Sequence, residues 1–157
     1  TLAAELAWQR WSAFPAPPAL DVLVALDITP PLVSTEAPPP DFTDVVTARL
    51  GGELWRRGAR VDVAARAGVA YLPSPVPPQL GLTSYADGDR LQLAAGAGVE
   101  LRDLRPYLTR PIAFDLALSW QHLEDRLTVK HVDRLPGQAF SSGGDVVHAT
   151  LTSTVRF

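Results

Sequence analysis

The chain has 157 residues, enough for one domain with a sizeable core, and it contains no cysteine, which excludes disulfides and thiolate metal sites. Its net charge of -3 and its pI near 5.5 argue against a general nucleic-acid-binding protein. Fifteen prolines and eleven glycines suit strands and turns better than a helical bundle. The sequence has no apolar run long enough for a transmembrane helix, but a transmembrane strand needs only about 9–11 alternating residues.

Alternation of apolar and polar residues predicts six antiparallel strands. They are expected at about 2–14, 43–57, 60–72, 90–101, 112–124 and 147–157. In residues 60–72, for example, every odd position is apolar or aromatic, whereas the even positions include Asp62 and Arg66. Ala, Leu and Arg would also suit a helix, but a period of two residues that recurs in six segments favours strands.

The connections between these strands alternate in length. Short links are expected at 58–59 and 102–111, and long loops rich in Pro, Gly, Ser and Asp at 29–42, 73–89 and 125–145. Residues 18–28 either extend the first strand or form a separate one. Short turns at one end and long loops at the other are typical of an outer-membrane barrel.

A soluble β-sandwich is the alternative for alternating strands, with the apolar faces meeting in a core. The expected strands are longer than the roughly 5–6 residues usual in soluble sheets, and their polar faces carry charges of both signs. Aromatic residues that could form an interfacial girdle lie toward strand ends, at Trp8, Trp55, Tyr71, Trp120 and Phe157. We therefore predict an all-β fold, an antiparallel transmembrane β-barrel.

The last strand has an apolar face that includes Val155 and a terminal Phe157. Such an end is the usual signal for assembly into the outer membrane, so Val155 and Phe157 are expected to be recognised by the barrel-assembly machinery. Because the chain starts at Thr1 and has no methionine, we expect it to be a mature piece or a C-terminal fragment of a longer protein. An intact barrel of about eight strands, counting 18–28 and 126–132 separately, is the alternative.

Two strings in the middle of the chain carry a resemblance to a known family. The string "GVAYLPSPVPPQ" (68–79) runs from a strand into Ser74, Pro75, Val76 and Pro77, and "DGDRLQLAAGAGVEL" (87–101) begins with Asp87, Asp89 and Arg90. Together they resemble the FadL family of outer-membrane transporters for long-chain fatty acids and other hydrophobic molecules. The strings "LAWQRWSAF" (6–14), "FTDVVTARLGGEL" (42–54), "FDLALSWQH" (114–122) and the terminal "VRF" are similar to further strands of that family.

The resemblance implies a barrel of about 14 strands, of which this chain would supply the last six. It implies passive uptake of a fatty acid or other hydrophobic molecule, with no cofactor, metal or nucleic acid. The implied surroundings are the lipid and lipopolysaccharide of the outer membrane of a Gram-negative bacterium. Some members of the family have a Lys a few residues before the Phe-x-Asp entry, but residues 31–40 contain no Lys or Arg, which leaves room for neutral hydrocarbons. The terminal signal also departs from the family at Thr152, where Gly is common.

Candidate ligand-binding residues lie on the polar faces and at the outer strand ends. They are Arg49, Arg66, Glu53, Gln92, Trp11 and Phe14. Arg49 and Arg66 could hold an anionic head group together, or they could belong to a structural network of neutralised charge. Trp11 and Phe14 could line a hydrophobic entry, or they could pack against a plug or loop.

An enzyme is not predicted. Asp115 and Ser119 share a strand face, but His122 is on the opposite one, so a triad fails without a bulge. The three histidines have no metal-ligand spacing with one another. Rival functions are a structural or adhesive outer-membrane barrel without transport and, less favoured, a barrel hydrolase.

Overall fold

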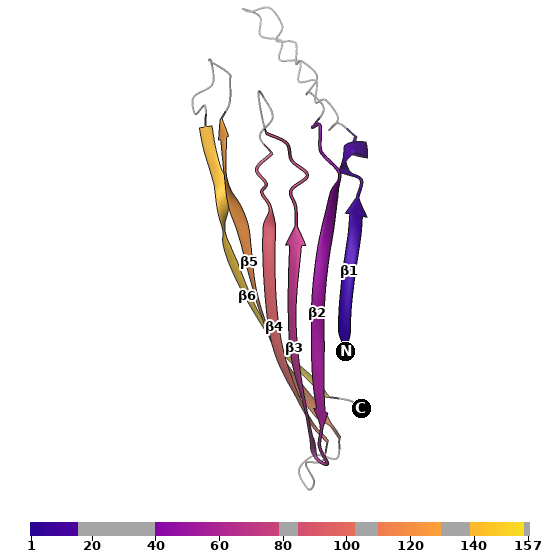
Figure 1. The fold of residues 1–157 in the computed structure, drawn as a ribbon. Helices are drawn as coiled ribbons and strands as arrows, with labels where there is room; N and C mark the ends of the chain where they lie inside the picture. Colours follow the sequence, from indigo (N-terminus) through magenta and orange to yellow (C-terminus); the bar gives the residue numbers. More distant parts are fainter. Residues whose placement is uncertain (16–39, 79–84, 103–109, 130–138, 156–157) are drawn as a thin grey trace, which may run out of the picture.

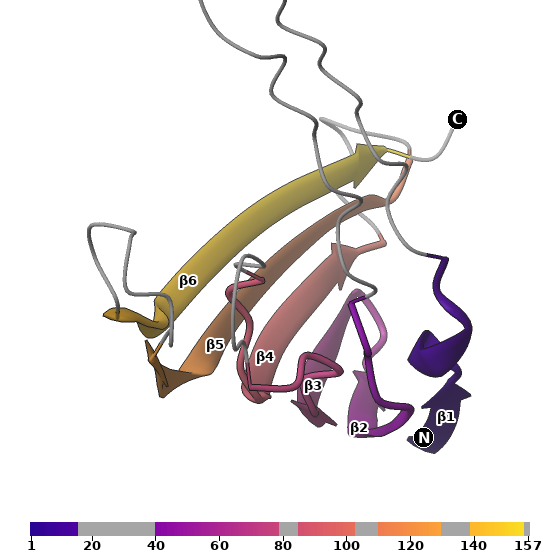
Figure 2. The ribbon, with the colours of Figure 1, turned by 90° about the horizontal axis from the view of Figure 1, so that it is seen from above.

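The computed structural model describes residues 1–15, 40–78, 85–102, 110–129 and 139–155. In these ranges the fold is all-β, with one antiparallel sheet in which each strand pairs with its neighbours in sequence (Figure 1). The strands are β1 (Leu2–Gln9), β2 (Val45–Arg57), β3 (Val61–Leu72), β4 (Arg90–Leu101), β5 (Ile112–Val129) and β6 (Ala139–Val155). Seen from above, the strands follow a curve rather than a flat plane (Figure 2). The sheet is open in the described part of the chain, with β1 and β6 at its two edges.

The first strand is shorter than its sequence pattern suggests. β1 ends at Gln9 instead of near residue 14, and a 3-10 turn follows at Trp11–Ala13. The backbone NH of Ser12 donates to Asp44 Oδ1 (2.9 Å), and that of Phe14 donates to Trp11 O (2.9 Å). These bonds turn the chain, although alternation alone would have continued the strand. Residues 18–28 lie outside the described residues.

The last two strands are longer than predicted, and the expected loop at 125–145 is wrong at both of its ends, while residues 130–138 lie outside the described residues. β5 continues to Val129 and β6 begins at Ala139. A bulge lies between Leu123 and Arg126, where β5 contains one more residue than β6 opposite it. A bulge reverses the faces that alternate residues occupy, so the period-two signal breaks at this point. Gly143 accommodates the bulge, because a Cβ there would lie 2.0 Å from Asp125 Oδ1.

The register aligns the alternating patterns into one apolar face across all six strands. This apolar face consists of the even positions of β1 and β2, the odd positions of β3 and β4, the even positions of β5 up to 122, and the odd positions of β6 from 145. One row across the sheet runs through Ala4, Leu50, Val69, Leu93, Trp120 and Val147. The exceptions are at the margins, where Arg56, His122, Asp145 and Ser153 lie.

The apolar face is exposed in the described part of the chain. Leu93, in its middle, is 44% exposed, and Leu151 is 74% exposed. The buried apolar side chains are Val45, Ala64 and Ala70, all on the opposite face, which we call the charged face. Among the described residues, no helix combines the length and the apolar character needed to cross a membrane.

Aromatic residues of the apolar face lie mainly toward the end of the sheet where the long loops attach. Trp8 lies in the outermost row at this end, opposite Val46. Tyr71 lies one row further in, and Trp120 lies one row beyond Tyr71. Trp55 does not belong to this group, contrary to its expected place in a girdle. It pairs with Ala64 on the charged face, because the parity of β2 puts odd residues there. Phe157 lies outside the described residues.

Candidate functional site

Three charged side chains form a network on the charged face. Arg66 of β3 donates from Nε to Glu53 Oε1 of β2 and from Nη1 to Asp115 Oδ1 of β5, both at 2.6 Å. The guanidinium also lies 5.7 Å from the centroid of the Trp55 ring. Glu53 is opposite Arg66 in the register, but Asp115 lies two strands away, on the far side of β4. The network therefore ties four adjacent strands together.

Two glycines of β4 make this long reach possible. Gly96 is opposite Arg66, and Gly98 is opposite Asp115. A Cβ at Gly98 would lie 2.5 Å from Asp115 Oδ1 and 3.4 Å from Arg66 Nη1. Because Gly98 has no side chain, Asp115 and Arg66 can meet above β4 at this point. An alternating sequence pattern does not reveal such a contact across an intervening strand.

We expect Gly98→Ala to weaken the contact between Arg66 and Asp115 and to cost about 1 kcal/mol, because the pair is partly exposed. Gly68→Ala is the control, since a Cβ there meets Leu50 O at an ordinary 3.4 Å. A double-mutant cycle of Gly98→Ala with Asp115→Asn measures the effect through chemical unfolding. Strictly additive losses would show that Gly98 does not act through Asp115.

Arg49 has a separate acidic partner. Its Nη1 donates to Glu5 Oε1 of β1 at 2.8 Å. The row with Glu5 and Arg49 is separated from the row with Glu53 and Arg66 by Gly51 and Gly68. The structure therefore does not bring Arg49 and Arg66 together as one clamp. Each guanidinium binds separate carboxylates, Glu5 for Arg49 and both Glu53 and Asp115 for Arg66.

A row of mostly small residues crosses the charged face between these two ion-pair rows. It consists of Ala3, Gly51, Gly68, Ala94, Ser119 and His148, one from each strand. Two hollows lie along this small-residue row, of about 670 Å³ on the β1 side and about 350 Å³ on the β6 side. Gly68 and Ala94 line both hollows, and Gln92 lines the larger one. The charged face thus has room for a ligand next to its charged groups.

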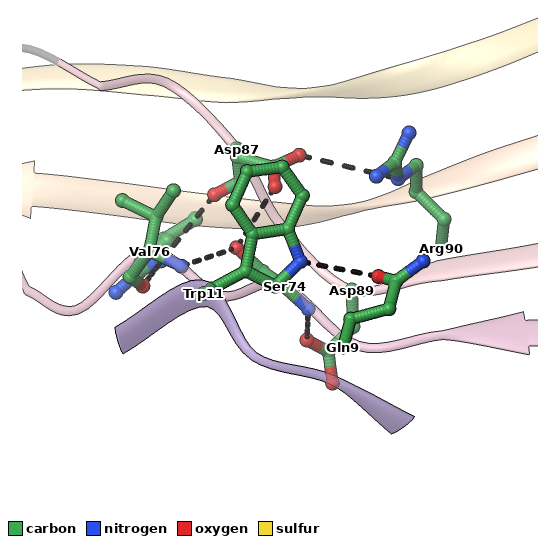
Figure 3. Close-up of polar contacts among 8 residues, drawn as sticks. Gln9, Trp11, Ser74, Val76, Asp87, Asp89 and Arg90 are labelled. Atoms are coloured by element: carbon green, nitrogen blue, oxygen red, sulfur yellow. Dashed lines mark hydrogen bonds and ion pairs between the residues drawn. The ribbon is translucent and has the colours of Figure 1, made fainter. Parts of the chain in front are cut away.

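Residues of the segments 71–76 and 87–90 meet at the loop end of the sheet (Figure 3). The backbone NH of Ser74 donates to Asp89 Oδ1 (2.8 Å), and its hydroxyl donates to Asp87 Oδ2 (3.0 Å). The hydroxyl of Tyr71 donates to the other oxygen of Asp89. Arg90 is more distant, with Nε 4.0 Å from Asp87 Oδ1. These contacts hold the segment after β3 against the segment before β4.

Neighbouring segments complete this loop-end network. Arg126 Nη1 donates to the carbonyls of Val76 (2.7 Å) and Asp87 (3.3 Å), and the carbonyl of Pro75 accepts from the backbone NH of Thr43 (2.9 Å). Pro77 continues the same segment. Sequence reasoning missed Arg126, because it lies beyond the bulge in a stretch expected to be a loop.

Hydrogen bonds lower the pKa of two carboxyl groups at this end. The backbone NH of Ser74, and then the Tyr71 hydroxyl, hold the pKa of Asp89 below its ordinary value. The side chain and then the backbone of Ser12 do the same for the pKa of Asp44. In both cases the donors stabilise the ionised form. Both carboxylates therefore stabilise the loop-end structure as long as they remain charged.

Four aromatic residues gather beside the loop-end network. In this aromatic cluster the ring centroids of Trp11 and Phe14 each lie within 6.0 Å of Phe42, and Phe42 lies 5.1 Å from Tyr85. Trp11 Nε1 donates to Gln9 Oε1 (3.1 Å; Figure 3), and Phe14 remains 49% exposed. Trp11 and Phe14 were candidates from the sequence. Phe42 and Tyr85 were missed, since both are in loops without a periodic pattern.

The residues considered for a catalytic triad are not brought together. His122 lies on the apolar face, where Nδ1 is 3.0 Å from Asp145 Oδ1. Asp115 is bound to Arg66 on the charged face, and Ser119 lines the smaller hollow there. Among the described residues, no group of three or more His, Asp or Glu side chains is placed to hold a metal ion. Val155 lies on the apolar face opposite Ile112.

Comparisons of the chain with protein-family models, with curated proteins and with solved structures find no match.

Proposed function

We propose that the chain forms part of the wall of an outer-membrane β-barrel, with the apolar face against lipid and the charged face toward the lumen. The observation that carries this proposal is the height of the apolar face. In β4 the apolar positions run without interruption from Leu91 to Leu101, which spans about 33 Å along the strand at about 3.3 Å per residue. At a strand tilt of about 35–45°, this span covers roughly 25 Å of membrane thickness, the usual height of an apolar barrel band.

The margins of the apolar face support the same orientation. Trp8, Tyr71 and Trp120 lie near its loop end, where aromatic residues favour the membrane–water interface. At that margin, in the same row as Leu91, His122 and Asp145 form a polar pair. A charged pair would be costly in the hydrocarbon layer but is acceptable at the water boundary. Long loops would then lie on the extracellular side.

We further propose that the barrel takes up hydrophobic molecules. The aromatic cluster offers apolar surface at the loop end, where a ligand from outside would first bind. The hollows along the small-residue row offer space on the lumen side. The resemblance of the strings at 68–79 and 87–101 to the FadL family supports the same function.

A structural barrel without transport is the second candidate. It is favoured by the ion pairs of Arg49 and Arg66, because a network that joins several strands would stiffen a wall without any ligand. Transport predicts a dependence of flux on the aromatic cluster, and a purely structural role does not.

The test measures uptake of a fluorescent long-chain alcohol into vesicles that have lipopolysaccharide in the outer leaflet and contain the full-length protein. We expect Phe14→Ala combined with Phe42→Ala to lower the rate about tenfold, as expected for the loss of aromatic contacts. Phe114→Ala, an aromatic change at the opposite end of the sheet, is the control and should leave the rate unchanged. Uptake no faster than in protein-free vesicles would leave the structural barrel as the function.

A further inference from the structure

The carboxylates on the central part of the charged face outnumber the guanidinium groups. Arg66 binds two of them, Glu53 and Asp115, whereas Arg49 binds one, Glu5. These five side chains therefore carry a net charge of -1. They lie on both sides of the small-residue row; Glu5 and Arg49 line the larger hollow, and Arg66 and Asp115 line the smaller one.

Guanidinium donors of Arg49 and Arg66 on this face bind carboxylates of the same face. Nε and Nη1 of Arg66 each donate to a carboxylate at 2.6 Å, and Nη1 of Arg49 donates to Glu5 at 2.8 Å. At these donors an incoming carboxylate would compete with an internal partner, and beside Arg66 it would meet two carboxylates. A neutral ligand meets neither obstacle, because the hollows are otherwise lined mainly by Gly and Ala.

We propose that the Glu53–Arg66–Asp115 network selects uncharged hydrophobic molecules over hydrophobic carboxylates. This inference rests on the proposed uptake function and names the class of cargo. The two carboxylates flank Arg66, which Asp115 reaches across β4 past Gly98, and the discrimination depends on their charges rather than on Gly98. The network therefore keeps two negative charges beside one positive charge at a fixed place in the wall.

The test compares binding of two fluorescent probes with the same alkyl chain, one an alcohol and the other a carboxylate. The full-length protein is placed in lipid nanodiscs, and empty nanodiscs give the background. The assay is run at low salt and at a fixed pH of 8, so that the charges on the protein are screened as little as possible. We expect the wild-type protein to bind the alcohol about tenfold more tightly than the carboxylate.

Two variants remove one negative charge each while keeping the size of the side chain. We expect Asp115→Asn and Glu53→Gln to reduce the preference for the alcohol about tenfold, and high salt to reduce the wild-type preference in the same direction. Gly98→Ala is the matched control, because it disturbs the contact but retains every charge. It should leave the preference within about twofold of the wild type, since the Coulomb interaction with the ligand is nearly unchanged.

The outcomes separate this inference from the proposed function. Equal binding of both probes by the wild type would overturn the selection of neutral cargo and leave uptake of hydrophobic molecules intact. Loss of preference in Gly98→Ala as large as in Asp115→Asn would also overturn it, because packing rather than charge would then discriminate. Binding of neither probe above empty nanodiscs would contradict the uptake function itself.

Discussion

Ala95→Arg is expected to destabilise the full-length protein in a lipid bilayer by about 2–4 kcal/mol, the cost of an arginine on the lipid side of a barrel near the bilayer midplane. Ala95 lies in the central rows of the apolar face, between Leu93 and Ala97. A guanidinium placed there would lose its hydration without gaining a partner.

Ala94→Arg is the matched control for this change. The two alanines are adjacent in β4, both are exposed, and their side chains lie on opposite faces of the sheet. On the charged face an arginine stays hydrated and lies near carboxylates, so we expect a change below about 1 kcal/mol. Reversible unfolding from vesicles by guanidinium measures both values. Similar costs for the two variants would show that the faces do not differ in environment.

Asp89→Asn is expected to open the loop-end network, with a loss of about 2–3 kcal/mol in local stability. Asp89 accepts hydrogen bonds from the backbone NH of Ser74 and from the hydroxyl of Tyr71, and bonds to a carboxylate are the stronger kind. Hydrogen exchange of the Ser74 amide reports the opening directly. Asp44→Asn is the control, because it removes the acceptor for Ser12 and should leave the Ser74 amide protected.

The pH dependence of this network follows from the lowered pKa of Asp89. Its pKa is lower in the folded protein than the ordinary value of 3.8, so the folded state binds the proton less tightly than the unfolded state does. The stabilisation is therefore fully present above the ordinary pKa and is lost as the pH falls through the folded pKa. In the wild type, the protection of the Ser74 amide relative to an unstructured amide should fall below about pH 4. Asp89→Asn should remove this acid-dependent step. An unchanged acid response in the variant would assign it to another group.

The antiparallel sheet was predictable because each strand has one exposed apolar face and one polar face. In β3 and β4 the alternation is almost perfect, and the predicted ranges nearly coincide with the strands. A period of two residues is a direct consequence of strand geometry, so the signal needs no knowledge of the partner strand.

The features that were not predicted depend on strand pairing and register, which an alternating sequence pattern does not contain. The bulge between Leu123 and Arg126 interrupts the alternation, which concealed the extension of β5 and the start of β6. Trp55 lies near a strand end, as an interfacial girdle requires, but its odd position in β2 places it on the charged face. The contact between Arg66 and Asp115 joins strands that are not neighbours, and only the register reveals that Gly96 and Gly98 lie between them.

The central claim is that lipid covers the apolar face, and single cysteine labels at adjacent positions test it most directly. The 157-residue chain contains no cysteine, so Ala95→Cys and Ala94→Cys each introduce a single site for a spin label into it. In bilayers we predict that the label at position 95 is relaxed by oxygen dissolved in lipid and protected from a water-soluble nickel reagent, with the reverse at position 94. A label at position 95 that is relaxed by the nickel reagent as strongly as the label at position 94 would contradict the membrane wall and the cargo proposed for it.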